Sequence, residues 1–408
     1  MTRLRKFAVG SFLAAIGLQI VTILSLMVTT KLRKILRGKR SPHFPALAPE
    51  RVAIGDNQAV VYTWGEHLFD AMISAIDGAQ RRVLFESYII KSDAVGQRFK
   101  NALESAAARG VDVYVVYDGF ANLVVPRSFF KFDPRIHVMK YPLWAAGWRF
   151  FSIRRMGRDH RKILAVDGHD AFIGGYNVGQ DYATVWRDTH LRITGPAAWD
   201  LDNAFVDFWN MHHHGRQLTE DGTPMWDPVF RLHRNVPGQL RFPIRGMYLE
   251  AIDRAQSHIL MTQAYFIPDR DILQALRVAR QRGVQVSILV PAVSNHVVAD
   301  WLSRGFYDEL LSDGIEILWY HGRMVHAKTA TIDGQWTTIG TANIDRLSLT
   351  GNYEINMEVF DPQLARAMER IFEFDSTHAA PVNFYDWNRR GLGERVSERI
   401  LRPLRPLL

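Results

Sequence analysis

One pattern occurs twice in this chain, and it constrains the fold more than any other feature of the sequence. Each copy reads His-x-Lys-x4-Asp, followed by Gly-x-x-Asn fourteen residues after the histidine and by a carboxylate twenty-eight residues after it. Five matched positions at equal offsets indicate an internal duplication, so we expect two copies of one structural unit. The matched residues are His160, Lys162, Asp167, Asn177 and Asp188 in the first copy and His326, Lys328, Asp333, Asn343 and Glu354 in the second.

The spacing of each copy suggests its chemistry. Residues i and i+2 of a strand point to the same face, so each motif strand carries an imidazole and an ammonium side by side. Two copies brought together place two histidines and two lysines around one point. This set suits a phosphoryl group, because lysines and asparagine amides can neutralise its oxygens. One histidine can then attack phosphorus while the other protonates the leaving oxygen.

The carboxylates of the pattern are expected to have two different roles. Asp188 and Glu354 are candidates for holding the histidine tautomers, as the carboxylate of a catalytic triad does, with a structural salt bridge as the alternative. Asp167 and Asp333 lie seven residues after their histidines, on the opposite strand face, and each precedes a glycine. We therefore assign these two aspartates to turn stabilisation. The two histidines must titrate apart, because a nucleophile has to be neutral and an acid protonated.

This doubled pattern resembles the phospholipase D superfamily over nearly all of the chain beyond residue 50, and most of all its bacterial cardiolipin synthases. The closer resemblance is carried by the stretches Phe85–Ile90, Trp186–Gly195, Tyr265–Asp269 and Tyr307–Leu311. It implies a duplicated α/β fold, in which two sheet-and-helix halves share one active site. It also implies that one histidine, for which we favour His160, takes a phosphatidyl group from phosphatidylglycerol as a phosphohistidine. An alcohol, in this branch a second phosphatidylglycerol, then accepts the group and glycerol is released, with no metal or other cofactor.

The chain departs from the family pattern at two places. Leu347 stands where arginine is usual after the second motif. The small hydroxyl residue of the glycine motif is Gly175 in the first copy and Thr341 in the second. Neither change removes a proposed catalytic group, and we expect both to affect the acceptor pocket.

Strand-like and helix-like stretches alternate in the same order in both halves, which predicts layered sheets flanked by helices. Arg109-Gly-Val111 and Arg282-Gly-Val284 mark equivalent points, and turn-forming residues place the boundary near 215–240. The predicted organisation is a membrane anchor with basic flanks (1–40), a linker (41–52), repeat 1 (53–220), repeat 2 (221–380) and a basic amphipathic tail (381–408).

The net charge of +8 comes from the amino-terminal segment. Residues 1–40 hold nine basic residues and no acidic one, which leaves 41 basic against 42 acidic residues elsewhere. Because the rest of the chain has no excess of basic residues, its charge argues against binding of nucleic acid, whereas basic residues beside an apolar run favour binding of anionic phospholipids and the membrane.

The uncharged run Phe7–Thr30 is long enough for a transmembrane helix and lacks a signal-peptide cleavage site. More basic residues follow this run than precede it, which predicts a single-pass anchor in the cell membrane with a cytoplasmic catalytic body.

Four further features bear on the function: two can be interpreted in two ways, and two argue against particular kinds of site. Tyr141–Arg158 interleaves aromatic residues with arginines, as expected of a lip at the membrane surface or of a core-packing loop. Arg389–Leu408 is expected to lie on the bilayer or to be a solvated terminal helix. Consecutive His212, His213 and His214 do not face one point on a helix, so an exposed helix end is expected rather than a metal site. The absence of cysteine excludes disulfides and thiolate ligands.

Three alternatives to the phosphatidyltransferase remain open from the sequence. A phospholipase D hydrolase would use the same covalent step with water as acceptor and release phosphatidic acid. A nuclease of the same superfamily is disfavoured by the anchor and by the lack of a basic body. A catalytically silent lipid-binding scaffold is hard to reconcile with both sets of histidine, lysine and carboxylate. No feature of the sequence sets the oligomeric state.

Overall fold

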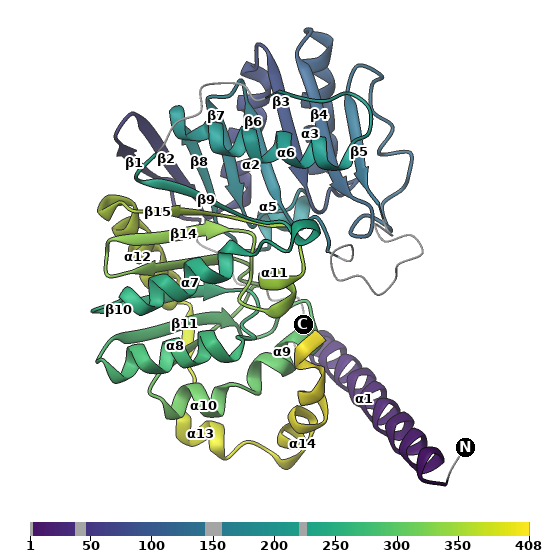
Figure 1. Cartoon of the computed structure of the whole chain (residues 1–408), viewed down its shortest axis with the longest axis vertical. Coiled ribbons are helices and arrows are strands. Elements are labelled where there is room, and N and C mark those ends of the chain that lie inside the picture. The colour runs from purple at the N-terminus through teal and green to yellow at the C-terminus, as the bar shows by residue number, and fades with distance from the viewer. Residues whose placement is uncertain (1–2, 37–45, 143–156, 220–226, 408) are drawn as a thin grey trace.

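Two mixed eight-stranded sheets form the body of the protein, one for each repeat, in a computed structural model that describes residues 3–36, 46–142, 157–219 and 227–407 (Figure 1). The first sheet has the order β1-β2-β8-β7-β6-β3-β4-β5 and the second β16-β12-β11-β10-β13-β14-β15-β9. In both, three parallel strands continue into antiparallel ones at the motif strand. The predicted α/β duplication is therefore confirmed.

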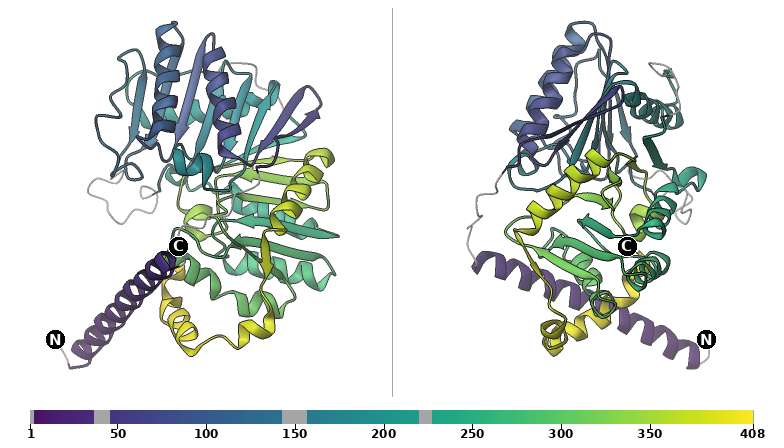
Figure 2. Two further views of the ribbon diagram at one scale, coloured as in Figure 1. Left: turned by 180° about the vertical axis from the view of Figure 1, so that it is seen from behind. Right: turned by 90° about the vertical axis from the view of Figure 1, so that its left-hand side faces the viewer.

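The first repeat consists of these elements, in chain order: β1 (Glu50–Ile54), β2 (Asn57–Tyr62), α2 (Gly65–Gly78), β3 (Arg82–Ser87), α3 (Ala94–Ala108), β4 (Asp112–Asp118), β5 (His137–Tyr141), β6 (Lys162–Val166), β7 (Asp170–Gly174), α5 (Gln180–Thr184), β8 (His190–Thr194), η1 (Pro196–Ala198) and α6 (Trp199–His212). Helices α2 and α3 cover one face of the sheet and α6 the other (Figure 2).

The second repeat follows the same plan, with these elements: β9 (Phe230–Asn235), η2 (Pro237–Gln239), α7 (Pro243–Arg254), β10 (His258–Gln263), α8 (Arg270–Gln281), β11 (Gln285–Pro291), α9 (Val297–Arg304), α10 (Tyr307–Ser312), β12 (Glu316–Tyr320), β13 (Lys328–Ile332), β14 (Trp336–Gly340), α11 (Arg346–Thr350), β15 (Glu354–Val359), α12 (Pro362–Ser376) and β16 (Ala379–Pro381). The chain then forms α13 (Phe384–Asn388), α14 (Leu392–Leu401) and η3 (Arg402–Leu407), which pack on repeat 2 through buried Trp387 and Leu401.

Local sequence explains why the two repeats match so closely. Asp93 and Asp269 cap helices α3 and α8 by accepting hydrogen bonds from backbone N–H groups of the first turn. Each helix ends just before an Arg-Gly pair whose glycine, Gly110 or Gly283, has φ +92°, a conformation that glycine adopts without strain. The β-branched strand that follows is buried in the sheet.

A central core joins the two repeats. It contains apolar side chains of β7 and β8, among them Ile173 and Leu191, together with Ile339 of β14 and Met357 of β15. Helices α6 and α12 contribute to the same core. Because this core is continuous, the strand ends that carry the two motifs are held against each other.

The predicted transmembrane run lies in α1 (Arg3–Leu36), a helix of 34 residues whose amino-terminal end projects away from the body (Figure 1). Ile23 and Leu26 pack against the core of repeat 2, and Gln19 Nε2 donates a hydrogen bond to the Ile400 carbonyl at 3.3 Å. In the described part of the chain no helix combines the length and the apolarity that crossing a membrane requires, so the predicted span is not confirmed.

The structure bears on the three consecutive histidines and on part of the aromatic and arginine-rich stretch. Helix α6 ends at His212 and His214 beyond it is exposed, as expected, whereas His212 itself is partly buried against Phe208 and Tyr353. Among the described residues no group of three or more histidine or carboxylate side chains is arranged to hold a metal ion. Residues 143–156 of the aromatic and arginine-rich stretch lie outside the described residues.

Candidate active site

The two motifs meet at one edge of the paired sheets. Strand β6 begins at Lys162, opposite Ser87 of β3, and β13 begins at Lys328, opposite Gln263 of β10. The histidine two residues before each lysine is hydrogen-bonded to the other repeat: the N–H of His160 donates to the Tyr353 carbonyl at 3.0 Å, and that of His326 to the Arg187 carbonyl at 2.6 Å. The backbone itself therefore fixes each histidine against the opposite repeat.

Each histidine pairs with the carboxylate of the other repeat. His160 Nδ1 lies 2.9 Å from Glu354 Oε2, and His326 Nδ1 lies 2.6 Å from Asp188 Oδ2. Both carboxylates are fully buried. A carboxylate that accepts the Nδ1–H leaves Nε2 with its lone pair as the reactive nitrogen. The four residues thus form a single site that neither repeat can build alone.

The two motif lysines are buried beside the histidines. Lys162 Nζ donates to the carbonyl oxygen of His160 at 2.6 Å, and Lys328 Nζ donates to that of His326. Burial lowers the pKa of Lys162 to about 7 and that of Lys328 to about 8, against the opposing effect of the neighbouring carboxylates. A buried ammonium with a lowered pKa is stabilised by a bound anion, which phosphate would supply.

The two carboxylates differ in their electrostatics. Burial raises the pKa of Glu354 to about 8, although Lys162 and the hydroxyl of Thr341 favour its ionised form. Burial also disfavours ionisation of Asp188, but Lys328 and His326 outweigh it and hold its pKa below the ordinary value. Asp188 is therefore the carboxylate that remains ionised at neutral pH.

Both imidazoles are neutral in this arrangement. Burial, followed by the charges of Lys162 and Lys328, holds the pKa of His160 well below its ordinary value. Burial and then Lys328 lower the pKa of His326 to about 3. A phosphodiester brings negative charge among these groups and raises the pKa of the rings, so protonation of one histidine is linked to substrate binding.

The difference between Gly175 and Thr341 now has a physical reason. Thr341 Oγ1 donates a hydrogen bond to Glu354 Oε2 at 2.6 Å. A Cβ atom at Gly175 would lie only 2.1 Å from Asp188 Oδ1, so the aspartate occupies the space of a side chain. Both positions lie against the buried carboxylates. Their expected effect on an acceptor pocket stays a prediction.

The motif asparagines are also buried at the site. Asn177 Oδ1 accepts a hydrogen bond from the Ile89 N–H at 3.1 Å. Asn343 Oδ1 is buried without a hydrogen-bond partner. A buried polar atom without a partner costs about 1–3 kcal/mol, so this amide is available to a ligand.

Asp167 and Asp333 lie at the opposite ends of the motif strands from the histidines. Their φ angles are +53° and +55°. Each carboxylate accepts three backbone N–H groups at 2.8–2.9 Å, from residues 80–82 for Asp167 and from residues 256–258 for Asp333. These aspartates hold the start of β3 and β10 in place and do not reach the histidines.

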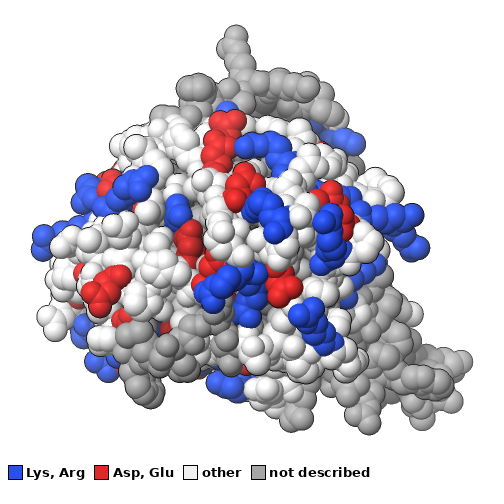
Figure 3. Space-filling model, turned by 90° about the horizontal axis from the view of Figure 1, so that it is seen from above, with Lys and Arg blue, Asp and Glu red and all other residues white. Residues whose placement is uncertain are grey.

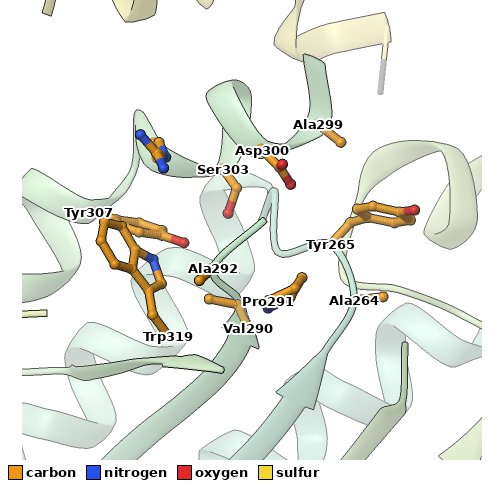
Figure 4. A pocket seen from close by; sticks show the side chains of 11 residues that line it. Ala264, Tyr265, Val290, Pro291, Ala292, Ala299, Asp300, Ser303, Tyr307 and Trp319 are labelled. Carbon is orange, nitrogen blue, oxygen red and sulfur yellow. The ribbon is translucent and has the colours of Figure 1, made fainter. Parts of the chain in front are cut away.

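Aromatic residues near the histidines were not assigned a role from the sequence. The ring of Tyr88 lies 4.8 Å from that of His160, and the rings of Trp186 and Tyr265 lie 5.0 and 6.4 Å from that of His326. All three belong to the stretches that carried the resemblance, which was the available signal. A cavity beside Tyr265, near Ala292 and Ala299, has room for about one water molecule, at about 10 Å³ (Figure 4).

Buried charges that the sequence analysis did not identify lie behind His160. Arg161 makes a two-pronged ion pair with Glu86, with Nη2 at 2.6 and 2.8 Å from the two carboxylate oxygens. Asp159 Oδ1 lies 3.6 Å from Arg161 Nε, and burial raises the pKa of Asp159 well above its ordinary value. Arg161 also lines a cavity of about 500 Å³ between α6, β9 and α7.

The surface over the outer end of repeat 1 shows basic and acidic groups interspersed, without a continuous basic field (Figure 3).

Comparisons with known proteins show the family to which the chain belongs. The family model described as "Cardiolipin synthase, PLD-like domain" matches residues 72–209 and 248–376. The major cardiolipin synthase of Bacillus subtilis is 30% identical over 367 residues, covering 86% of this chain and 76% of that protein. A cardiolipin synthase of Geobacillus thermodenitrificans is 31% identical over 364 residues, covering 86% and 72%.

Among solved structures, the phosphatidylserine synthase of Haemophilus influenzae superposes with a TM-score of 0.65 at 12% identity, covering 88% of this chain and 97% of that one. The polyphosphate kinase of Porphyromonas gingivalis gives a TM-score of 0.54 at 14% identity, covering 91% and 58%. At these identities the two structures indicate a shared fold.

Proposed function

This chain belongs to the family of cardiolipin synthases with phospholipase D-like domains, and from that premise we propose that it transfers a phosphatidyl group from phosphatidylglycerol to the hydroxyl of a second phosphatidylglycerol. The observation that carries the proposal is the crossed pairing of two histidines with two buried carboxylates between two lysines. The products would be cardiolipin and glycerol.

In the first step, Nε2 of His160 attacks phosphorus. The bond from phosphorus to the glycerol oxygen breaks with its electron pair, and His326 gives that oxygen a proton. In the second step the acceptor hydroxyl gives its proton to His326 and its oxygen bonds to phosphorus. The bond between phosphorus and His160 then breaks, and the nitrogen recovers its lone pair.

The two roles follow from the two carboxylates. An ionised Asp188 stabilises the imidazolium form of His326, which suits a general acid. The pKa of both rings is lowered, but Glu354, whose pKa burial raises to about 8, gives His160 no such stabilisation, so His160 remains the neutral nucleophile. Lys162, Lys328, Asn177 and Asn343 would surround the non-bridging oxygens, where charge accumulates in the transition state.

We further propose that the protein works at the cell membrane with its catalytic body on the cytoplasmic side. This is supported by the basic residues that flank the apolar run of α1 and by the exposed apolar side chains along that helix.

The test is to incubate detergent-solubilised protein with phosphatidylglycerol and to measure lipid products and free glycerol. Cardiolipin with an equal amount of glycerol supports the proposal, whereas phosphatidic acid as the sole product makes the protein a hydrolase. Cleavage of nucleic acid with lipid untouched makes it a nuclease. A reaction quenched with denaturant at mildly alkaline pH, where the bond between phosphorus and the histidine nitrogen survives, should carry a phosphatidyl adduct on the peptide that contains His160, and an adduct on the His326 peptide instead reverses the two roles.

A further inference from the structure

Exposed apolar side chains lie in segments that neighbour the catalytic residues. We name six of them the apolar rim: Phe120, Leu123, Val124, Val185, Val293 and Leu347, which are 39–82% exposed. They come from four separate segments: the loop after β4, the loop after α5, the loop after β11 and helix α11. Two of these segments are connected to a catalytic histidine by contacts of a neighbouring residue, and the other two by their place in the sequence beside a residue of the site.

The loop after β4 is fixed to Tyr88. Buried Asn122 donates to the Tyr88 carbonyl at 2.8 Å and accepts from the Ile90 N–H at 2.9 Å. Since the Tyr88 ring lies 4.8 Å from that of His160, the neighbouring Leu123 and Val124 stand at the side of the site formed by repeat 1. They are 58% and 82% exposed.

Repeat 2 also has a tyrosine joined to an asparagine, here through the tyrosine side chain. The hydroxyl of Tyr265 donates to Asn295 Oδ1 at 2.6 Å, and its ring lies 6.4 Å from that of His326. Val293, in the same loop as Asn295, is 42% exposed. Each catalytic histidine is thus bordered by a tyrosine whose partner asparagine belongs to a loop that exposes an apolar side chain.

The other two segments complete the rim. Val185 immediately precedes Trp186, whose ring lies 5.0 Å from that of His326. Leu347 lies in α11, which is capped by Asp345 and follows the motif residue Asn343. Exposed apolar side chains are common singly, but a group around one opening marks a site of interaction.

The neighbourhood of the rim indicates what covers it. Helix α1 packs beside α9, which begins directly after the loop of Val293, and α1 exposes Leu18, Val21 and Leu24 by more than half. Exposed Arg127 and Arg346 lie close in sequence to Val124 and Leu347. Apolar side chains can contact the acyl chains of a bilayer while arginines at their edge contact its anionic headgroups.

We propose that the apolar rim docks on an anionic phospholipid bilayer, so that a lipid headgroup passes from the membrane to the histidines without entering water. This inference rests on the proposed function, because it assumes that the substrate is a lipid. Leu123, Val124, Val293 and Leu347 would insert at headgroup depth, and α1 would lie at the same surface.

The absence of cysteine from the chain makes a direct test available. Full-length Val124→Cys is labelled with an environment-sensitive fluorophore and mixed with vesicles of phosphatidylglycerol and phosphatidylcholine. The emission should shift to the blue and be quenched by lipids that carry a quencher in the upper acyl chain. The control is Phe360→Cys. Phe360 is 40% exposed and follows β15 directly, whereas Glu354 begins that strand at the site. A label on this cysteine should remain in water.

Activity gives a second measurement. The ratio of activity on vesicles to activity on a short-chain, monomeric phosphatidylglycerol should fall about tenfold in Leu123→Ser/Val124→Ser, and stay the same in Phe360→Ser. A Val124 label that remains in water while the protein is vesicle-bound overturns the proposal. So does a blue shift without vesicles that grows with protein concentration, which would indicate a second copy of the chain. Lack of transfer on both substrates would instead refute the proposed function.

Discussion

His326 Nδ1 lies 2.6 Å from Asp188 Oδ2, although the two residues are 138 positions apart and belong to different repeats. We expect Asp188→Asn to lower kcat by about 10²–10⁴-fold, because the amide cannot stabilise the imidazolium or hold its tautomer. The combined variant His326→Ala/Asp188→Asn should be no worse than His326→Ala alone, since the two act as a unit.

The matched control is Asp170→Asn, which removes a carboxylate of the same repeat that pairs with Arg192 on the sheet. Its kcat should stay within about twofold of the parent. Losses of Asp188→Asn and His326→Ala that simply multiply would show that the pair does not act as one group.

The pH dependence of substrate capture should reflect the buried lysines. Lys162 and Lys328, with pKa values of about 7 and about 8, bind phosphate only when protonated. Their charge is present below these values and lost above them, so kcat/KM should fall as the pH rises through about 8. A profile in detergent micelles measures this.

Lys328→Arg provides the comparison for that profile, because a guanidinium stays charged at every pH used. Its rate should be lower overall, yet its ratio of kcat/KM at pH 9 to that at pH 7 should exceed the ratio of the parent. Equal ratios would show that the alkaline limb belongs to another group.

Gly175 and Thr341 should not be interchangeable. Gly175→Thr places atoms where Asp188 lies, since even a Cβ would be 2.1 Å from its Oδ1, so this variant should lose at least about 10²-fold in kcat. Thr341→Gly removes one hydrogen bond to Glu354 and should lose about tenfold or less. Circular dichroism should show that both variants fold, and an unchanged kcat in Gly175→Thr would contradict the packing argument.

Asp333 should matter for stability and not for chemistry. Asp333→Ala removes an acceptor of three backbone N–H groups at a residue with φ +55°, so we expect a loss of about 2–3 kcal/mol in urea denaturation. The kcat of the folded variant at 25 °C should be unchanged. A large loss of kcat with parental stability would instead place Asp333 in the reaction.

The sequence determined everything that depends on local spacing. Equal offsets gave the duplication, the strand that carries His160 and Lys162, and the turn that holds Asp167. The Arg-Gly pairs at Gly110 and Gly283 marked the ends of equivalent helices, because only a residue tolerant of positive φ suits that position. Periodicity also located the core strands, since residues buried on both faces of a strand are almost all apolar or β-branched.

Only the tertiary structure decided which carboxylate faces which histidine. An offset of twenty-eight residues places Asp188 in the same repeat as His160, yet the continuous core of β7, β8, β14 and β15 packs the repeats so that it meets His326. The same packing explains Gly175, whose missing side chain makes room for Asp188. Contacts between residues of different repeats depend on how the two sheets pack. The spacing of residues along the sequence does not specify that packing, so it cannot predict which carboxylate lies beside which histidine.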